Sequence, residues 1–304
     1  MYYIVYGIFY LISLLPWFII YAISDFIYFI LYYVVKYRRG VVMNNLKIAF
    51  PEKTEKELTA ISKESYHGLV DTFIEVIKLL TLSKKKLLEM CPMSGMEALE
   101  PYFKSNRNIQ IIAGHFYSWE MANPIMGVSF PIPSLGVYMP LSNKVMDKVM
   151  YKIRARFGTK LISSKNFTRE YLHYTQGANV LILAAHQNAG KVEKIKLMYF
   201  FSQPAPFIPG PAKGAHKFDA VIVYCHYYRE KRGKYRFHLE LVTDNPKSID
   251  QDELTRIFRD RIEASIKEHP GSYLWTHKRW KHQWKPEHAD LWIDNVPPPP
   301  FPGH

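Results

Sequence analysis

The sequence of 304 residues is poor in the residues that mark disulfide, zinc and nucleotide sites. Cys91 and Cys225 are the only cysteines, they lie far apart, and no second pair completes a Cys-x-x-Cys or zinc-ligand spacing. We therefore expect reduced, buried thiols in a reducing compartment. The chain also lacks a glycine-rich dinucleotide or phosphate loop and any internal repeat, which disfavours nucleotide-binding and repeat architectures.

Charge is missing from the start of the chain. Residues 1–24 contain no charged side chain, and Asp25 is the only one before Lys36. This segment reaches the roughly 20 apolar residues that a helix needs to cross a bilayer, so we predict a membrane helix over residues 1–35. Pro16 either kinks it or divides it into a spanning piece and a helix along the interface. A long, buried core helix is the alternative.

The flanks of this segment predict its orientation. It begins MYYIVYGIF, without the basic start and small-residue cleavage site of a secretory signal, so we expect it to be retained. Lys36, Arg38 and Arg39 follow at once, and an excess of Lys and Arg beside a membrane segment marks the cytoplasmic side. We therefore expect a cytosolic domain over residues 36–292 and a proline-rich tail over residues 293–304.

Positive charge is in excess elsewhere. The formal net charge is +13 and the pI is near 9.4, which predicts anionic partners: nucleic acid, acidic lipid headgroups or an acidic carrier protein. Charge alone does not choose among them. Nucleic acid is disfavoured, because the chain has an apolar anchor and no recognised nucleic-acid-binding module.

Past the anchor, short β-rich runs alternate with helical stretches, which predicts an α/β fold with a mixed central sheet flanked by helices. Runs that are apolar almost throughout are expected to be central strands, whereas the alternating run near residue 238 is typical of a strand toward an edge. The predicted strands are 108–113, 179–185, 219–228 and 235–242. The predicted helices are 52–69, 143–158 and 253–269.

The stretch GHFYSWE follows the first of these strands. His115 and Glu120 are five positions apart, about 500° of rotation on a regular helix, so they cannot pair on one straight helix. They can pair if the strand ends near Gly114 and a helix begins around Ser118. A carboxylate that orients an imidazole leaves its other nitrogen to take a proton from a hydroxyl, which is general-base chemistry. A surface histidine beside a helix-start glutamate is the alternative.

The sequence resembles the lauroyl/myristoyl (lipid A secondary) acyltransferases of Gram-negative bacteria, within the lysophospholipid acyltransferase superfamily. The composition within the matching blocks is close to that of Bacteroidota-type members. The resemblance runs from the anchor almost to the tail. Five blocks in order behind an N-terminal anchor carry it: RRGVVMNNLKIAFPE, GHFYSWE, YMPLSNKVMDKVMYKIRARFG, FFSQPAPFIPGPAKGA and HPGSYLWTHKRWK.

This resemblance implies a glycerolipid acyltransferase-like fold and a defined reaction. An acyl chain carried as a thioester on acyl carrier protein would pass to a hydroxyl of a phosphorylated, acylated glucosamine disaccharide, at the inner face of the cytoplasmic membrane. His115 would deprotonate that hydroxyl and Glu120 would orient His115, with no metal or other cofactor. Acyl carrier protein, the phosphorylated glycolipid and the membrane are the implied partners, and both substrates are anionic.

Four basic residues are candidates for substrate binding. Arg154 and Arg156 match the family's Arg-x-Arg block and suit phosphates, although a solvated or membrane-facing helix face is an equal alternative. Arg279 lies with Lys278 and Lys281 in an aromatic-rich basic patch that fits either the acceptor or the membrane interface. Lys213, in GPAKGA, either approaches a substrate or belongs to a strand-to-helix turn. His277 in the last block is interpreted as structural.

Three departures from the family pattern bear on the acceptor. His186-Gln187 stands where many relatives have Asp-Gln, Ala212 where Bacteroidota members commonly have glutamate, and Tyr117-Ser118 where Gly-Asn is usual. These changes indicate either another acceptor, such as an amino-acid lipid or a lysophospholipid, or reduced activity. A non-catalytic protein that binds anionic lipid is a third hypothesis, in which His115 and Glu120 are relics.

Overall fold

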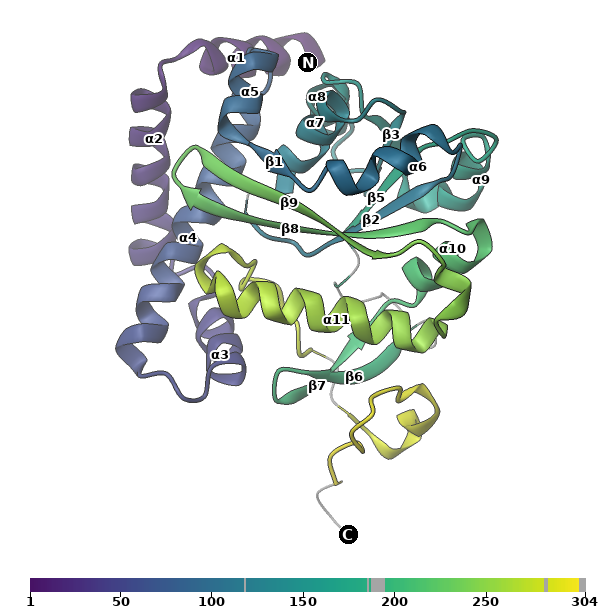
Figure 1. The fold of residues 1–304 in the computed structure, drawn as a ribbon. Helices are drawn as coiled ribbons and strands as arrows, with labels where there is room; N and C mark the ends of the chain where they lie inside the picture. The colour runs from purple at the N-terminus through teal and green to yellow at the C-terminus, as the bar shows by residue number, and fades with distance from the viewer. Residues whose placement is uncertain (118, 185, 187–194, 282–283, 301–304) are drawn as a thin grey trace.

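The structure is a computed structural model that describes residues 1–117, 119–184, 186, 195–281 and 284–300 (Figure 1). A seven-stranded sheet lies at its centre, in the order β1-β9-β8-β2-β5-β3-β4. All neighbouring strands in it are parallel except the antiparallel pair β8 and β9. The strands are β1 (Met93–Ser94), β2 (Ile109–Ala113), β3 (Ser134–Tyr138), β4 (Lys160–Ser163), β5 (Val180–Ala184), β8 (Val221–Lys231) and β9 (Lys234–Thr243).

Helices cover both faces of this sheet, which confirms the predicted α/β class. Ile111 and Ile112 are consecutive in β2 and therefore point to opposite faces. Ile111 packs in the large cluster with α7 and α8, whereas Ile112 packs with α10 and α11. The helices are α1 (Tyr2–Leu14), α2 (Trp17–Phe29), α3 (Arg39–Ala49), α4 (Glu55–Lys78), α5 (Lys84–Met90), α6 (Glu100–Lys104), α7 (Trp119–Ser129), α8 (Lys144–Ala155), α9 (Phe167–Leu172), α10 (Gly210–Phe218) and α11 (Gln251–Glu268).

The predicted elements agree closely with the observed ones. The two fully apolar runs are the central strands β2 and β5, and the alternating run is β9, which has only the two-residue β1 outside it. The helix predicted over 52–69 is longer: α4 begins after a capping box of Thr54 and Glu57 and continues to Lys78. A second sheet, β6 (Lys196–Phe200) with β7 (Gln203–Phe207), was not predicted, and its prolines explain why. Both cysteines are buried and free, as expected.

Pro16 divides the N-terminal apolar segment, which is one of the two outcomes predicted for it. α1 ends at Leu14 and α2 begins at Trp17, and the two helices run in very different directions (Figure 1). A π-helical turn, Ile30–Val34, continues α2. By length and composition, the stretch Trp17–Val34 is the one helix of the described residues that could cross a membrane.

A buried carboxylate joins this N-terminal segment to the α/β domain. Asp71 of α4 is fully buried and accepts a hydrogen bond from the Ser24 hydroxyl of α2 at 2.5 Å. Arg229 of β8 and Arg232 of the following turn donate to the same carboxylate at 2.7 and 2.8 Å. Arg232 also binds Asp25 of α2 at 2.7 Å. One face of α2 therefore makes polar contacts with the domain.

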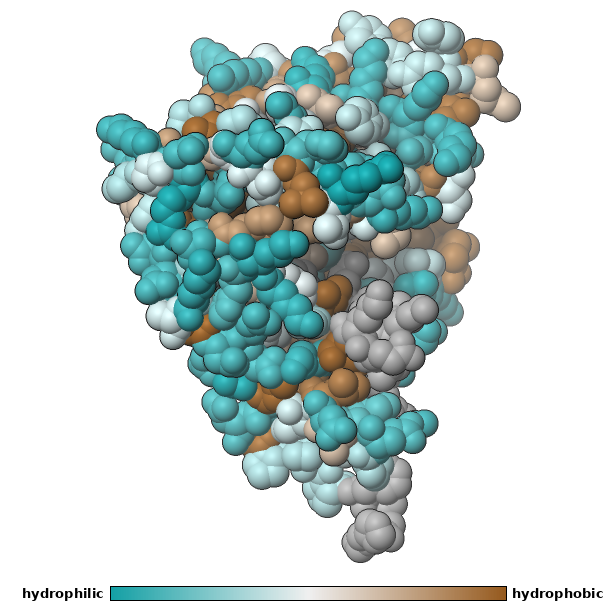
Figure 2. All heavy atoms as spheres, turned by 90° about the vertical axis from the view of Figure 1, so that its right-hand side faces the viewer, coloured by the Kyte–Doolittle hydropathy of each residue, from teal (hydrophilic) through white to brown (hydrophobic). Residues whose placement is uncertain are grey.

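The other face of the N-terminal helices is apolar and exposed. The side chains of α1 and α2 that are more than half exposed include Tyr3, Ile4, Leu11, Phe18 and Phe26. Figure 2 views the molecule from the side opposite to α2, and hydrophilic side chains cover most of that face. So many exposed apolar side chains on two neighbouring helices are typical of a surface that contacts another protein or a membrane.

We predict that Asp71→Ala lowers the free energy of unfolding by about 3 kcal/mol, because it leaves two partly buried guanidinium groups without their shared carboxylate. Urea unfolding of the full-length protein in detergent, followed by tryptophan fluorescence, measures the loss.

Asp25→Ala is the matched control, since Asp25 binds the same Arg232 but is half exposed. Solvent screening limits its contribution to less than about 1 kcal/mol. Equal losses in the two variants would show that the buried carboxylate has no special role.

Candidate active site

A cavity of about 310 Å³ opens at the carboxyl ends of β2, β3 and β5. Its lining includes His115, Trp119, Glu120, Tyr138 and Arg154. Side chains that follow parallel strands meet at this edge of a sheet, which is where open α/β proteins bind their ligands. Sequence analysis predicted two of these residues as catalytic and one as substrate-binding, and the fold brings all three together.

Sheet register places two histidines beside each other. Ala113 of β2 is paired with Ala184 of β5, and each strand is followed two residues later by a histidine, His115 and His186. Their Nδ1 atoms lie 3.4 Å apart. His186 is buried and His115 half-buried. Sequence analysis noted His186 only as a departure from the family pattern, but the equal offset from two adjacent parallel strands was a signal that it faces His115.

The backbone around His115 is held from both sides. The Tyr227 hydroxyl of β8 donates to the carbonyl of Gly114 at 2.8 Å. On the other side, the Tyr117 amide donates to the Ser272 carbonyl at 2.7 Å, and the Leu274 amide donates to the His115 carbonyl at 3.3 Å. The loop after β2 is therefore fixed by the strand before it, by β8 and by the segment after α11.

Burial keeps both imidazoles neutral. It lowers the pKa of His115 to about 4, with a smaller contribution from nearby His277, and it holds the pKa of His186 well below its usual range. In a hydrogen bond between two neutral imidazoles, one Nδ1–H group donates and the other Nδ1 atom accepts. Among the described residues the Nε2 atom of His115 has no hydrogen-bond partner. In the tautomer in which Nδ1 of His115 donates to His186, this Nε2 atom carries the lone pair and can accept a proton.

Glu120 is bound by an arginine rather than by His115. Its two oxygens accept hydrogen bonds from Nε and Nη2 of Arg154, at 2.8 and 2.6 Å, and the Trp119 indole donates at 3.1 Å. Such a two-point pair is among the stronger ion pairs. The strand ends at Ala113 and the helix begins at Trp119, close to the predicted positions, but no direct hydrogen bond joins Glu120 to His115 in the described residues.

The other predicted binding residues lie apart from this cavity's lining. Arg156, two positions after Arg154, donates to the carbonyls of Leu79 and Leu82 at 2.7 and 2.6 Å, just after α4 ends. Lys213 is exposed on α10. Arg279 is buried, with its guanidinium over the rings of Phe200 and Phe207 at 4.4–5.0 Å from their centroids.

His186 and Ala212 stand where the resemblance implies acids, and the surroundings of the two residues differ. His186 contacts His115, as described above, whereas Ala212 is buried on α10 in the cluster under the sheet. The Tyr117 side chain is also buried, and its hydroxyl oxygen lies 3.2 Å from the hydroxyl oxygen of Ser65. Gln187 and Ser118 lie outside the described residues.

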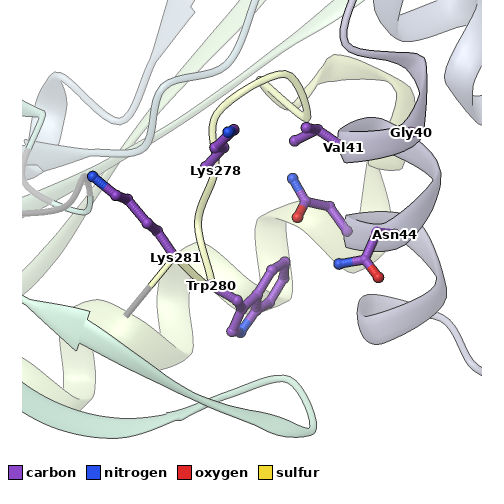
Figure 3. Close-up of a pocket in the computed structure, with 7 residues that line it drawn as sticks. Gly40, Val41, Asn44, Lys278, Trp280 and Lys281 are labelled. Atoms are coloured by element: carbon purple, nitrogen blue, oxygen red, sulfur yellow. The ribbon is translucent and has the colours of Figure 1, made fainter. Parts of the chain in front are cut away.

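A second cavity, of about 320 Å³, is basic (Figure 3). Lys278, Trp280 and Lys281 line it together with Asn44 and Asn45 of α3, and the Trp280 ring points toward this helix, whereas the Lys281 side chain points away from it. The side-chain amide of Asn45 donates to the backbone carbonyls of Trp275 and His277, both at 2.8 Å. These bonds connect α3 to the segment that also contacts His115.

A third cavity, of about 500 Å³, is mostly apolar and shares Trp119 with the His115 cavity. Ile27 of α2 and Leu31 of the π-helical turn form one wall. Phe73 of α4, which is more than half exposed, lies with its ring 6.0 Å from that of Trp119. An apolar groove formed partly by the N-terminal helices thus adjoins the cavity that contains His115.

Several known proteins of lipid A biosynthesis are similar to this chain over most of its length. Lipid A biosynthesis lauroyltransferase of Escherichia coli strain K12 is 22% identical over 90% of this chain and 89% of its own length. Lipid A biosynthesis palmitoleoyltransferase of the same strain is 20% identical, with 81% and 80% covered. A lipid A biosynthesis acyltransferase of Haemophilus influenzae is 22% identical, with 79% and 74% covered.

The sequence profile of a single family matches residues 1–282, nearly the whole chain. This match agrees with the resemblance in the five sequence blocks, and His115 and Glu120 of GHFYSWE lie in one cavity at the carboxyl edge of the sheet. The chain therefore belongs to the bacterial lipid A biosynthesis acyltransferase family.

Proposed function

We propose that this acyltransferase moves a fatty acyl chain from the thioester of an acyl carrier protein to a hydroxyl of a lipid A precursor. One observation carries the proposal: a neutral His115, with Nε2 free, lies in a cavity that adjoins an apolar groove. Neutral imidazole is the form that accepts a proton, and a lipid substrate needs apolar surface beside the reacting group.

In the proposed reaction His115 acts as the general base. Nε2 takes the proton of the acceptor hydroxyl while its oxygen attacks the thioester carbonyl carbon. The C–S bond then breaks, an ester remains on the acceptor, and the departing thiolate takes the proton back from His115. The reaction uses the tautomer in which Nδ1 of His115 donates to Nδ1 of His186, which leaves the lone pair on Nε2 of His115. No metal or other cofactor is required by these steps.

Glu120 acts through Arg154 in this proposal. The ion pair joins the start of α7 to the end of α8 and forms one wall of the His115 cavity. Arg154 is partly accessible and lines the same cavity as His115. We propose that the pair positions the substrates against His115 and keeps a fixed positive charge beside the developing oxyanion.

Both substrates are proposed to reach the site from the cytoplasmic face of the inner membrane. The exposed apolar side chains of α1 and α2 would contact lipid, and the apolar groove beside Trp119 would receive an acyl chain. Because the contacts of Ser24 and Asp25 keep α2 against α4, the N-terminal helices are proposed to hold the domain on the membrane surface.

Charge supports anionic substrates. The net charge of +13 attracts both an acidic carrier protein and a phosphorylated disaccharide. The basic cavity of Lys278 and Lys281 suits a phosphate, and its aromatic side chain, Trp280, suits a sugar ring. This cavity is proposed to bind the acceptor headgroup, because its segment also contacts the backbone of His115.

An acyl acceptor other than lipid A is the second candidate. His186 lies against His115 at a position where many relatives have an acid, so this chain presents an imidazole to the reaction where others present a carboxylate. An amino-acid lipid or a lysophospholipid is the alternative acceptor class.

We predict that His115→Gln lowers the rate of acyl transfer at least about 100-fold, because it removes the base and keeps the fold. The assay uses full-length protein in detergent, radiolabelled acyl-acyl carrier protein and a panel of acceptors that includes a tetra-acylated lipid A precursor.

His173→Gln, which changes an exposed histidine after α9, is the control and should keep full activity. Transfer to a different acceptor alone would favour the second candidate. Unchanged transfer in the His115 variant would contradict the assigned role.

We further predict that Arg154→Lys lowers kcat/KM about tenfold or more, because lysine keeps the charge but cannot make the two-point contact with Glu120. Steady-state kinetics measures the change.

Arg156→Lys is the same exchange on the same helix, but Arg156 contacts backbone carbonyls beyond α4. It should lower the melting temperature and leave kcat/KM close to that of the wild type. The opposite pattern would assign substrate binding to Arg156 instead.

A further inference from the structure

Three metal-ligating side chains converge where the end of α11 meets β8, away from the lining of the His115 cavity. Nε2 of His226 lies 3.8 Å from one carboxylate oxygen of Glu268, and Nε2 of His269 lies 3.4 Å from the other. One ligand atom from each of the three residues can be chosen so that all lie within 4.8 Å of one another. Glu268 is the last residue of α11, and His269 follows it in a non-helical conformation.

The two imidazole nitrogens that face Glu268 are not satisfied by the protein. Both Nε2 atoms are buried, and neither has a hydrogen-bond partner in the described residues. A buried polar atom without a partner costs about 1–3 kcal/mol. Two such imidazole nitrogens beside one carboxylate therefore call for an explanation.

Tyr228 holds the imidazoles in this arrangement. Its ring stacks on that of His269, with centroids 3.6 Å apart and planes 14° apart, and it meets the ring of His226 edge-on at 5.5 Å. The two imidazole rings are themselves 5.7 Å apart. Both imidazoles are thus packed against one aromatic side chain, which reduces the ordering that a ligand would have to impose.

We propose that His226, Glu268 and His269 bind one Zn²⁺ ion. Zn²⁺ takes two imidazoles and a carboxylate in tetrahedral geometry, in which bonds of about 2.0–2.1 Å place the ligand atoms about 3.3 Å apart. Nε2 of His269 is already near that distance from one Glu268 oxygen, at 3.4 Å, and one ligand atom from each residue lies within 4.8 Å of the others, so small side-chain rotations would close the site. Glu268 is more than half exposed, so a water molecule from solvent completes the fourth position.

The site would stabilise a segment that the active site uses. Pro270–Ser272 follows His269 directly, and the Ser272 carbonyl accepts the Tyr117 amide beside His115. Zn²⁺ would fasten the end of α11 to β8 at the start of this segment. Its role is structural, and the proposal is independent of the acyl acceptor and of the chemistry at His115.

The experiment is a zinc titration of the full-length protein in detergent after treatment with EDTA. Isothermal titration calorimetry with ZnCl₂ gives affinity and stoichiometry, and elemental analysis after gel filtration gives bound metal per chain. We expect the wild type to hold one more Zn²⁺ per chain than His226→Gln or His269→Gln. We also expect Zn²⁺ to raise the melting temperature of the wild type but not of these variants.

Two further variants keep the result interpretable. Glu268→Gln changes an exposed side chain that folding does not require, and it should weaken Zn²⁺ binding at least about tenfold. His173→Gln removes a distant exposed histidine and should bind as the wild type does. Zinc binding that is absent from the wild type, or unchanged in all three ligand variants, would overturn the proposal.

Discussion

The charge of Asp71 has to be compensated inside the protein, and the placement of the N-terminal helices depends on how that is done. The carboxylate has no exposed surface, and its partners come from three parts of the chain: Ser24 of α2, Arg229 of β8 and Arg232 of the next turn. Loss of one partner would leave a buried charge, so the arrangement is specific. It keeps α2 beside α4, and the apolar groove next to Trp119 exists because α2 forms one of its walls.

The cavity that contains His115 depends on a second constraint, the register of the parallel strands. Because Ala113 pairs with Ala184, the residues that follow β2 and β5 are brought side by side, and His115 meets His186. Burial by the surrounding elements keeps these imidazoles neutral, which is the form that general-base chemistry needs. Trp119 lines both the cavity and the groove, so the proposed base and the apolar surface proposed for a lipid chain are adjacent.

Most of the fold and part of the site could be predicted from the sequence. Apolar runs specify β2 and β5, since a strand covered on both faces has little choice of residues, and the Pro16 break is also local. Contacts between segments that are distant in the sequence were harder to predict. Glu120 was predicted to pair with His115, but Arg154, 34 residues away, offers two donors and binds it instead. The β6–β7 hairpin escaped prediction because Pro204 and Pro206 are unusual in strands.

The pH dependence of kcat/KM for acyl transfer tests the central claim, that neutral His115 is the base, most directly. A base works only when it is deprotonated, so its pKa of about 4 should leave kcat/KM unaffected by this group from pH 8 down to about pH 5.5, with loss only at more acidic pH. A fall with a midpoint near pH 6.5, the ordinary value for histidine, would mean that His115 is solvated in the working enzyme, and would contradict the account.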